Sequence, residues 1–211
     1  MKNKSIIVMA ALFAVATTFA QGFKVKASGD QTFSFEDNRG RNQASFFSTT
    51  PLEDITGLSN DVKGSVTFNV SDISTMKGSV SISTASLKTG IESRDNHLQG
   101  KGWLDAESYP EISFTIKKVS DVNSLSDNML EAKVLGDFFV HGVTKEVTAD
   151  VTMIYLDESE ETKSRAPGDL LSVKAKFNIK LSDYNVDNKI LGLKVADDIE
   201  VTATMVGSNA K

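Results

Sequence analysis

From residue 23 onward, hydrophobic and polar side chains alternate with a period of two rather than 3.6. The alternation is clearest at 66–70 and 112–116, where Val, Phe and Ile are separated by single Ser, Thr or Asn residues. It returns at 134–140, 173–181 and 199–205. Such alternation is typical of β-strands with one buried face and one face in water. The pattern therefore predicts an all-β protein.

Polar segments rich in turn-forming residues separate these runs at 36–40, 120–128 and 157–169. Strands joined by such connectors favour an antiparallel meander, and about eight strands can remove their open edges by closing into a barrel. Residues 91–98 interrupt the alternation, because Ile91 and Leu98 lie seven positions apart, on one face of a helix. We therefore predict an eight-stranded antiparallel β-barrel with a short helix near one end.

The first twenty residues have the pattern of a secretory signal peptide rather than of a folded element. Lys2 and Lys4 precede an unbroken apolar run, and small residues at Thr18 and Ala20 predict cleavage after Ala20. The apolar run is too short to span a bilayer. We expect an exported, soluble protein with a signal peptide at 1–20 and a single domain at 21–211.

Charge and cysteine content narrow the classes of function. The formal net charge is −5, and removal of the signal peptide with its two lysines lowers it to −7. An acidic body without a basic stripe argues against a nucleic-acid partner. The sequence contains no cysteine, which excludes disulfides, thiolate catalysis and cysteine-based zinc sites.

Two blocks in the middle of the chain resemble a known family. The first runs from Ser-Leu-Lys-Thr-Gly at 86–90 through Arg-Asp-Asn-His-Leu at 94–98 and Trp-Leu-Asp at 103–105 to Tyr-Pro-Glu-Ile-Ser-Phe at 109–114. The second is Gly-Asp-Phe-Phe-Val-His-Gly-Val-Thr-Lys at 136–145. In this order and spacing they are similar to the signature of YceI-like proteins. Trp103-Leu104, where the family commonly has two phenylalanines, and the segment 181–186 depart from its pattern.

This resemblance implies a lipocalin-like barrel, located in the periplasm or released from the cell, that holds a long apolar molecule such as a polyisoprenoid or a fatty-acid-derived amide. An eight-stranded barrel has an interior that holds either one small ligand or side chains alone. Non-catalytic lipid binding, transport or storage is therefore the expected function. No cofactor and no metal ion are expected, and a homodimer is an open option.

Inward-facing residues of the strands are the candidate lipid contacts, although each suits an ordinary packed core equally well. Trp103, the single tryptophan, would lie at the pocket mouth or would fasten the short helix to the barrel. Arg94 and His97 are candidates for contact with a lipid head group. The predicted lipid-binding set is Phe33, Phe35, Phe68, Trp103, Phe114, Phe138, Phe177 and Ile179.

Two other functions remain open at this level. One is an enzyme acting on such a lipid, with His97 or His141, the two histidines of the chain, as the acid or base. The other is a barrel with a solid core that serves as an interaction module. A bound apolar ligand would favour the lipid carrier or the enzyme over the interaction module. Loss of lipid turnover on replacing either histidine would identify the enzyme.

Overall fold

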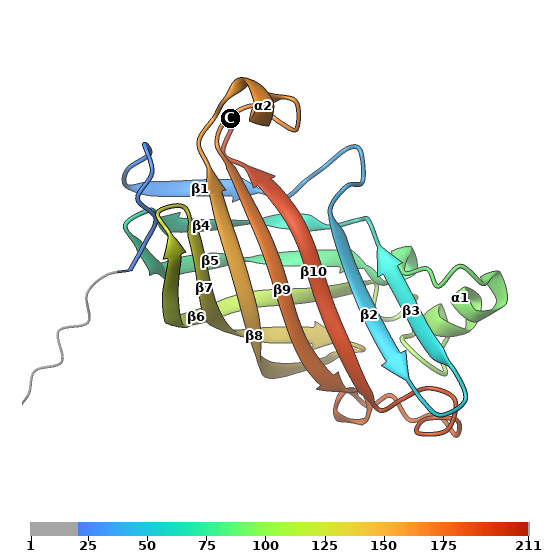
Figure 1. Cartoon of the computed structure of the whole chain (residues 1–211). Helices are drawn as coiled ribbons and strands as arrows, with labels where there is room; N and C mark the ends of the chain where they lie inside the picture. The colour runs from blue at the N-terminus through green and yellow to red at the C-terminus, as the bar shows by residue number, and fades with distance from the viewer. Residues whose placement is uncertain (1–20, 211) are drawn as a thin grey trace, which may run out of the picture.

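The computed structural model describes residues 21–210, so the predicted signal peptide lies outside the described residues. The described part consists of strands, two short α-helices and two single 3₁₀ turns at 84–86 and 181–184 (Figure 1). The elements, in chain order, are β1 (Asp30–Ser34), β2 (Gln43–Thr49), β3 (Asp54–Ser59), β4 (Lys63–Asn69), β5 (Asp72–Ser83), α1 (Glu92–Gln99), β6 (Glu111–Ser126), β7 (Met129–Val140), β8 (Val143–Leu156), α2 (Glu160–Lys163), β9 (Leu170–Lys180) and β10 (Asp198–Ser208).

The strands form one antiparallel sheet that closes on itself. Eight of them follow the order β1-β4-β5-β6-β7-β8-β9-β10, and the ring is closed where Ser34 of β1 pairs with Ser208 of β10. The hairpin β2–β3 adds to β10 beside this junction, with Phe46 opposite Val201. The predicted eight-stranded antiparallel barrel is confirmed, and the hairpin is an addition to it that the alternation pattern did not reveal.

Along each strand, every second side chain points into the barrel. An irregularity in β6 keeps the apolar side chains of this strand pointing inward along its length. Phe114 and Ile116 are partly buried at even positions, whereas the next buried residue is Val119, at an odd position. The pairing of β6 with β7 shifts between Ile116 and Lys118. Such a bulge inserts one extra residue, so the apolar side chains on both sides of it face the same interior.

One end of the barrel is filled by aromatic side chains, and we call it the closed end. The rings of Phe33 and Phe68 stack with their centroids 5.7 Å apart, and Tyr155 meets Phe33 edge-on at 5.5 Å. Phe23, from the segment before β1, packs against Phe68 and Tyr155. The Tyr155 hydroxyl donates a hydrogen bond of 2.7 Å to Asp169, so its polar end is satisfied although the residue is fully buried.

A partly buried polar network covers the same end. The Asp37 carboxylate accepts hydrogen bonds from Arg41 at 3.0 Å and from Arg165 at 2.7 Å, and Arg165 also donates to Asn42. Asn42 in turn donates to the Phe35 and Val206 carbonyls and accepts from the Val206 backbone N–H. The hydrogen bonds from Arg41, and then those from Arg165, hold the pKa of the Asp37 carboxyl far below its usual range, although burial opposes them.

Helix α1 lies at the other end of the barrel, which agrees with the predicted short helix near one end (Figure 1). Its expected apolar contact through Ile91 is absent, because Ile91 precedes the first turn and is exposed. Polar bonds hold the helix instead: the buried Asp95 carboxylate accepts from the Thr89 backbone N–H and hydroxyl at 2.6 and 2.7 Å. Gln99 donates to the carbonyls of Ala85 and Leu87.

Candidate functional site: an apolar cavity open at one end

Side chains do not fill the part of the barrel near α1 completely. This part contains a cavity of about 380 Å³, within the range of small-molecule sites in proteins. The cavity ends at the closed end with Phe35, Met153 and Met205, and every strand of the ring except β1 contributes to its wall. Its deeper wall is apolar and includes Val66, Val134, Val151 and Val173.

Three phenylalanines from neighbouring and facing strands form an aromatic surface in the cavity wall. Phe138 on β7 lies edge-on to Phe177 on β9, with ring centroids 5.1 Å apart, and Phe114 on β6 lies 5.8 Å from Phe177. Phe138 also meets the buried ring of Tyr184 at 5.8 Å. The wall is therefore rigid where these rings support one another and apolar where they face the cavity.

The structure places the sequence-predicted lipid contacts in two groups. Phe35, Trp103, Phe114, Phe138, Phe177 and Ile179 line the cavity. Phe33 and Phe68 do not, and their predicted location needs correction: they belong to the aromatic cluster of the closed end. The reason is depth, because alternation reports which face of a strand is buried and does not report how far along the barrel axis a side chain lies.

The cavity reaches solvent between three chain segments, which we call the mouth: the β2–β3 turn at 50–53, the region of α1 at 88–107 and the β9–β10 loop at 185–196. The lining residues that are solvent-exposed all come from these segments, namely Glu53, Ser93, His97, Ile190 and Lys194. Arg94 pairs with Glu53, and Asn188 donates to the Gly102 carbonyl at 3.0 Å. These contacts hold the three segments together around one opening.

Arg94 and His97, the predicted head-group contacts, both line this opening. The Arg94 guanidinium donates to the Glu53 carboxylate at 3.2 Å and to the Thr89 hydroxyl at 3.1 Å, so it is held in place and does not form a local ion pair with Asp95. Hydrogen bonds from the side chain and backbone of Thr89 lower the pKa of the Asp95 carboxyl, which therefore stays ionised beneath the helix. Charge is thus concentrated at the mouth and the deep wall stays apolar.

The two histidines lie in different parts of the structure. His97 lies on α1 at the mouth, whereas His141 is outside the cavity lining, in the β7–β8 turn. The His141 ring packs edge-on against Tyr109 at 5.0 Å, and its Nδ1 lies 2.9 Å from the Tyr184 carbonyl. Among residues 21–210, no three His, Asp or Glu side chains are grouped so that they could hold a metal ion.

Sequence reasoning missed two contributors to the site. The hairpin strand β2 supplies Ala44 and Phe46 to the wall, and the β9–β10 loop supplies Ile190 and Val195. In β2, two adjacent phenylalanines at 46 and 47 obscure the alternation, and the loop has no periodic pattern. One sequence feature could have indicated the contribution of the loop. Ile, Leu and Val residues occur there among Asn, Asp and Lys residues.

The chain is similar to known proteins along most of its length. The sequence profile of the YceI-like domain matches residues 23–206. Protein YceI of Escherichia coli O157:H7 is 31% identical over 133 residues, which is 62% of each chain. The chain spans about 50 to 62% of the length of the first curated relatives that it matches.

Two solved structures share the fold at low sequence identity. BcnA of Burkholderia cenocepacia is 19% identical with a TM-score of 0.64, over 81% of this chain and 99% of BcnA. A polyisoprenoid binding domain from Saccharophagus degradans, implicated in plant cell wall breakdown, is 13% identical with a TM-score of 0.62, over 87% of this chain and all of that domain. The profile match over nearly the whole described barrel shows that this chain belongs to the YceI-like family.

Proposed function

We propose that the protein binds one long apolar lipid, a polyisoprenoid or a fatty-acid-derived amide, within the barrel and carries or stores it without changing it chemically. The observation that carries this proposal is the cavity itself: about 380 Å³ of space with an apolar deep wall in a barrel whose other end is tightly filled. A solid-core interaction module would need side chains in that space. The polyisoprenoid binding domain from Saccharophagus degradans supports the same class of ligand.

The lipid would enter tail first, with its polar end at the mouth. Each methylene that leaves water contributes about 0.8 kcal/mol, so a long tail in contact with Phe114, Phe138 and Phe177 needs few polar partners. Arg94 and His97 at the mouth would contact the head group. Catalysis is not part of the proposal, because the charged groups lie at the rim, where the end of a lipid would be, and His141 lies outside the cavity.

We propose that the protein carries its lipid in the periplasm. Residues 1–20 have the pattern of a secretory signal peptide, and a periplasmic carrier of a water-insoluble molecule would serve an aqueous space between membranes. In residues 21–210, no helix is long and apolar enough to cross a membrane.

The first experiment is organic extraction of protein purified without detergent, followed by mass spectrometry. We expect a single class of long-chain lipid in nearly equal amount to protein. A filled-cavity variant tests whether that lipid is inside the barrel. Ala175 on β9 lines the cavity, so Ala175→Phe should remove the lipid, whereas Lys174→Phe, on the outward face of the same strand, should retain it.

Equal lipid content in both variants would show that the lipid lies elsewhere. An empty extract, with no change in Trp103 fluorescence on adding isoprenoids or fatty amides, would overturn the carrier proposal and favour the interaction module. Conversion of a bound lipid that stops in His97→Ala would favour the enzyme.

A further inference from the structure

Large hydrophobic side chains that face water are concentrated at the mouth. Among the described residues, six such side chains are exposed, and four belong to the mouth segments: Leu52 (72% exposed), Leu193 (63%), Ile91 (50%) and Ile190 (37%). The others are Phe47 on β2 and Leu125 on the β6 side of the β6–β7 turn. Exposed hydrophobic residues gathered around one opening mark an interaction site more often than scattered ones do.

These side chains are presented on the tips of loops. Leu52 lies in the β2–β3 turn, whose backbone is held by the Thr50 hydroxyl. Leu193 follows Gly192, which has a φ of +80°, in a turn closed by a 3.0 Å hydrogen bond from the Leu193 backbone N–H to the Ile190 carbonyl. Ile91 precedes the first turn of α1. Three separate loop tips therefore carry one apolar residue or more at the rim of the same cavity.

We propose that the mouth docks on the surface of a lipid bilayer, with Leu52, Ile91 and Leu193 inserted at the level of the head groups. This inference rests on the proposed function. A lipid tail could then pass between the bilayer and the cavity without crossing water. Shallow insertion of a few apolar side chains is enough for reversible binding at a membrane surface.

Charge favours a bilayer of zwitterionic lipids as the partner. The mouth segments carry five basic residues against six acidic ones, a net charge of −1, although the whole chain carries −5. The acidic residues are Glu53, Glu92, Asp95, Asp105, Glu107 and Asp187, and the basic ones are Lys88, Arg94, Lys101, Lys189 and Lys194. A nearly neutral rim neither requires anionic lipid nor is repelled by a neutral surface.

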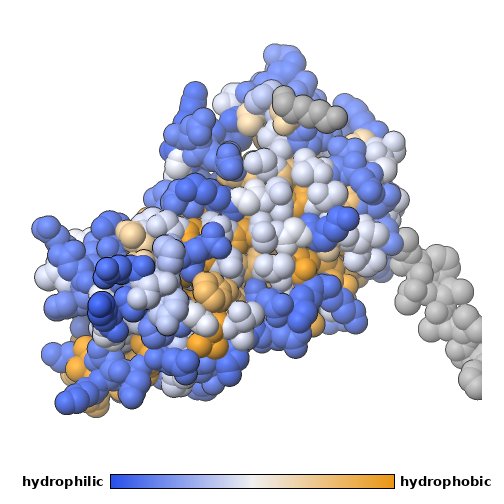
Figure 2. Space-filling view, turned by 180° about the vertical axis from the view of Figure 1, so that it is seen from behind, coloured by the Kyte–Doolittle hydropathy of each residue, from blue (hydrophilic) through white to orange (hydrophobic). Residues whose placement is uncertain are grey.

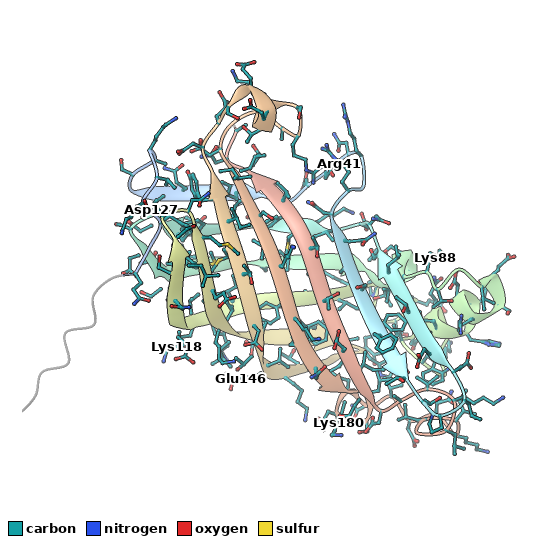
Figure 3. All side chains as sticks on the ribbon, in the orientation of Figure 1. Arg41, Lys88, Lys118, Asp127, Glu146 and Lys180 are labelled. Carbon is teal, nitrogen blue, oxygen red and sulfur yellow. The ribbon has the colours of Figure 1, made fainter. Side chains whose placement is uncertain are left out.

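The opposite end of the barrel has the reverse character. The loop at 157–169, which contains α2, carries five acidic and two basic residues, and its helix is fully polar. Figure 3 shows Lys88 beside the mouth and Asp127, two residues from Leu125, on the far side of the barrel. In the view from behind, hydrophobic surface appears in small patches among hydrophilic atoms, including some at the end that contains α1 (Figure 2). The molecule therefore has a definite orientation for docking.

Flotation with phosphatidylcholine vesicles tests the docking proposal on the mature protein. We expect the wild type to float with the vesicles, with little dependence on salt. A variant with Leu52→Ser, Ile91→Ser and Leu193→Ser should bind at least tenfold more weakly, while Leu125→Ser, a matched change at the far side, should bind as the wild type does. Thermal unfolding of both variants checks that they are folded.

Equal flotation of the triple variant and the wild type, or no flotation of either, would overturn the proposal. So would a dimer of the wild type that becomes a monomer in the triple variant without any vesicle binding, since a second copy would then cover the mouth. A dansyl-labelled fatty acid, excited through Trp103, separates this inference from the proposed function. The triple variant should still bind this soluble probe, and a wild type that cannot bind it would instead refute the cavity as a lipid site.

Discussion

The two ends of the barrel use similar side chains for opposite purposes. At the closed end, Phe33 and Phe68 have partners on all sides and are fully buried. In the cavity wall, Phe114 and Phe177 have partners on one side and a cavity on the other. Stability is not uniform across a protein, and regions that bind ligands are drawn from its less stable parts. A barrel can therefore keep a cavity in one part of its interior when the other part is packed densely.

The largest effect is expected from removing one aromatic ring from the closed end and one from the cavity wall. Phe68→Ala should lower the free energy of unfolding by about 3–5 kcal/mol, since it leaves a cavity in a packed cluster. Phe177→Ala should cost less, because one face of that ring already lacks partners. Urea unfolding measures both effects. Probe affinity should fall in Phe177→Ala and be retained in Phe68→Ala, and the reverse result would refute the assignment of the two ends.

The next largest effect on the free energy of unfolding is expected from the polar network around Asp37 at the closed end. Asp37→Asn removes charge-assisted hydrogen bonds to Arg41 and Arg165 and should cost about 2–3 kcal/mol at neutral pH. Because the folded-state pKa of Asp37 is lowered, its contribution is fully present above its ordinary pKa near 4 and is lost as the pH falls below that value.

Unfolding in urea at a series of pH values should therefore show wild type and Asp37→Asn converging in stability toward acid. A constant difference between them from pH 7 to pH 2 would show that the carboxylate charge does not stabilise this network.

Packing at the hairpin gives a smaller effect. A Cβ atom on Gly57 of β3 would lie 2.2 Å from the ring of Phe46, a cavity-lining residue on β2. Gly57→Ala should destabilise the protein by about 1–3 kcal/mol, since the ring must move. In Gly57→Ala combined with Phe46→Ala this penalty should vanish, as a double-mutant cycle would measure. Simple additivity of the two changes would show that the ring does not lie over Gly57.

The smallest effect on stability belongs to the mouth. Arg94→Gln breaks a partly exposed ion pair with Glu53 and should change the free energy of unfolding by less than about 1 kcal/mol. If Arg94 contacts the head group, the same change should reduce the preference for a fatty acid over the alcohol of equal length. Lys101→Gln, a charge loss elsewhere on the mouth, should leave that preference intact. Unchanged selectivity in Arg94→Gln would remove this residue from the site.

The sequence predicted the fold well because strand alternation is imposed locally by burial. The runs around Phe114 and Phe177 identified inward faces correctly, and the short helix at 92–99 was found from its break in the pattern. The site was predicted less well, since the depth of Phe33 and Phe68 depends on where each strand begins relative to its neighbours. The expected contact through Ile91 was wrong, because the helix is held by polar bonds of Asp95 and Gln99 and its apolar contact with the core is made by Leu98.

The junction between β1 and β10 has a consequence for the rate and order of folding. Ser34 pairs with Ser208, and Asn42 bonds to Val206 across 164 residues of sequence, so the ring closes only when both ends of the chain are present. Contacts of such long sequence separation are slow to form, because the entropy of closing a large loop is lost before the contacts are gained. Until β2 and β1 pair with it, β10 offers an unpaired edge to other chains. Closure of this seam should therefore be the last step of folding and the step most exposed to aggregation.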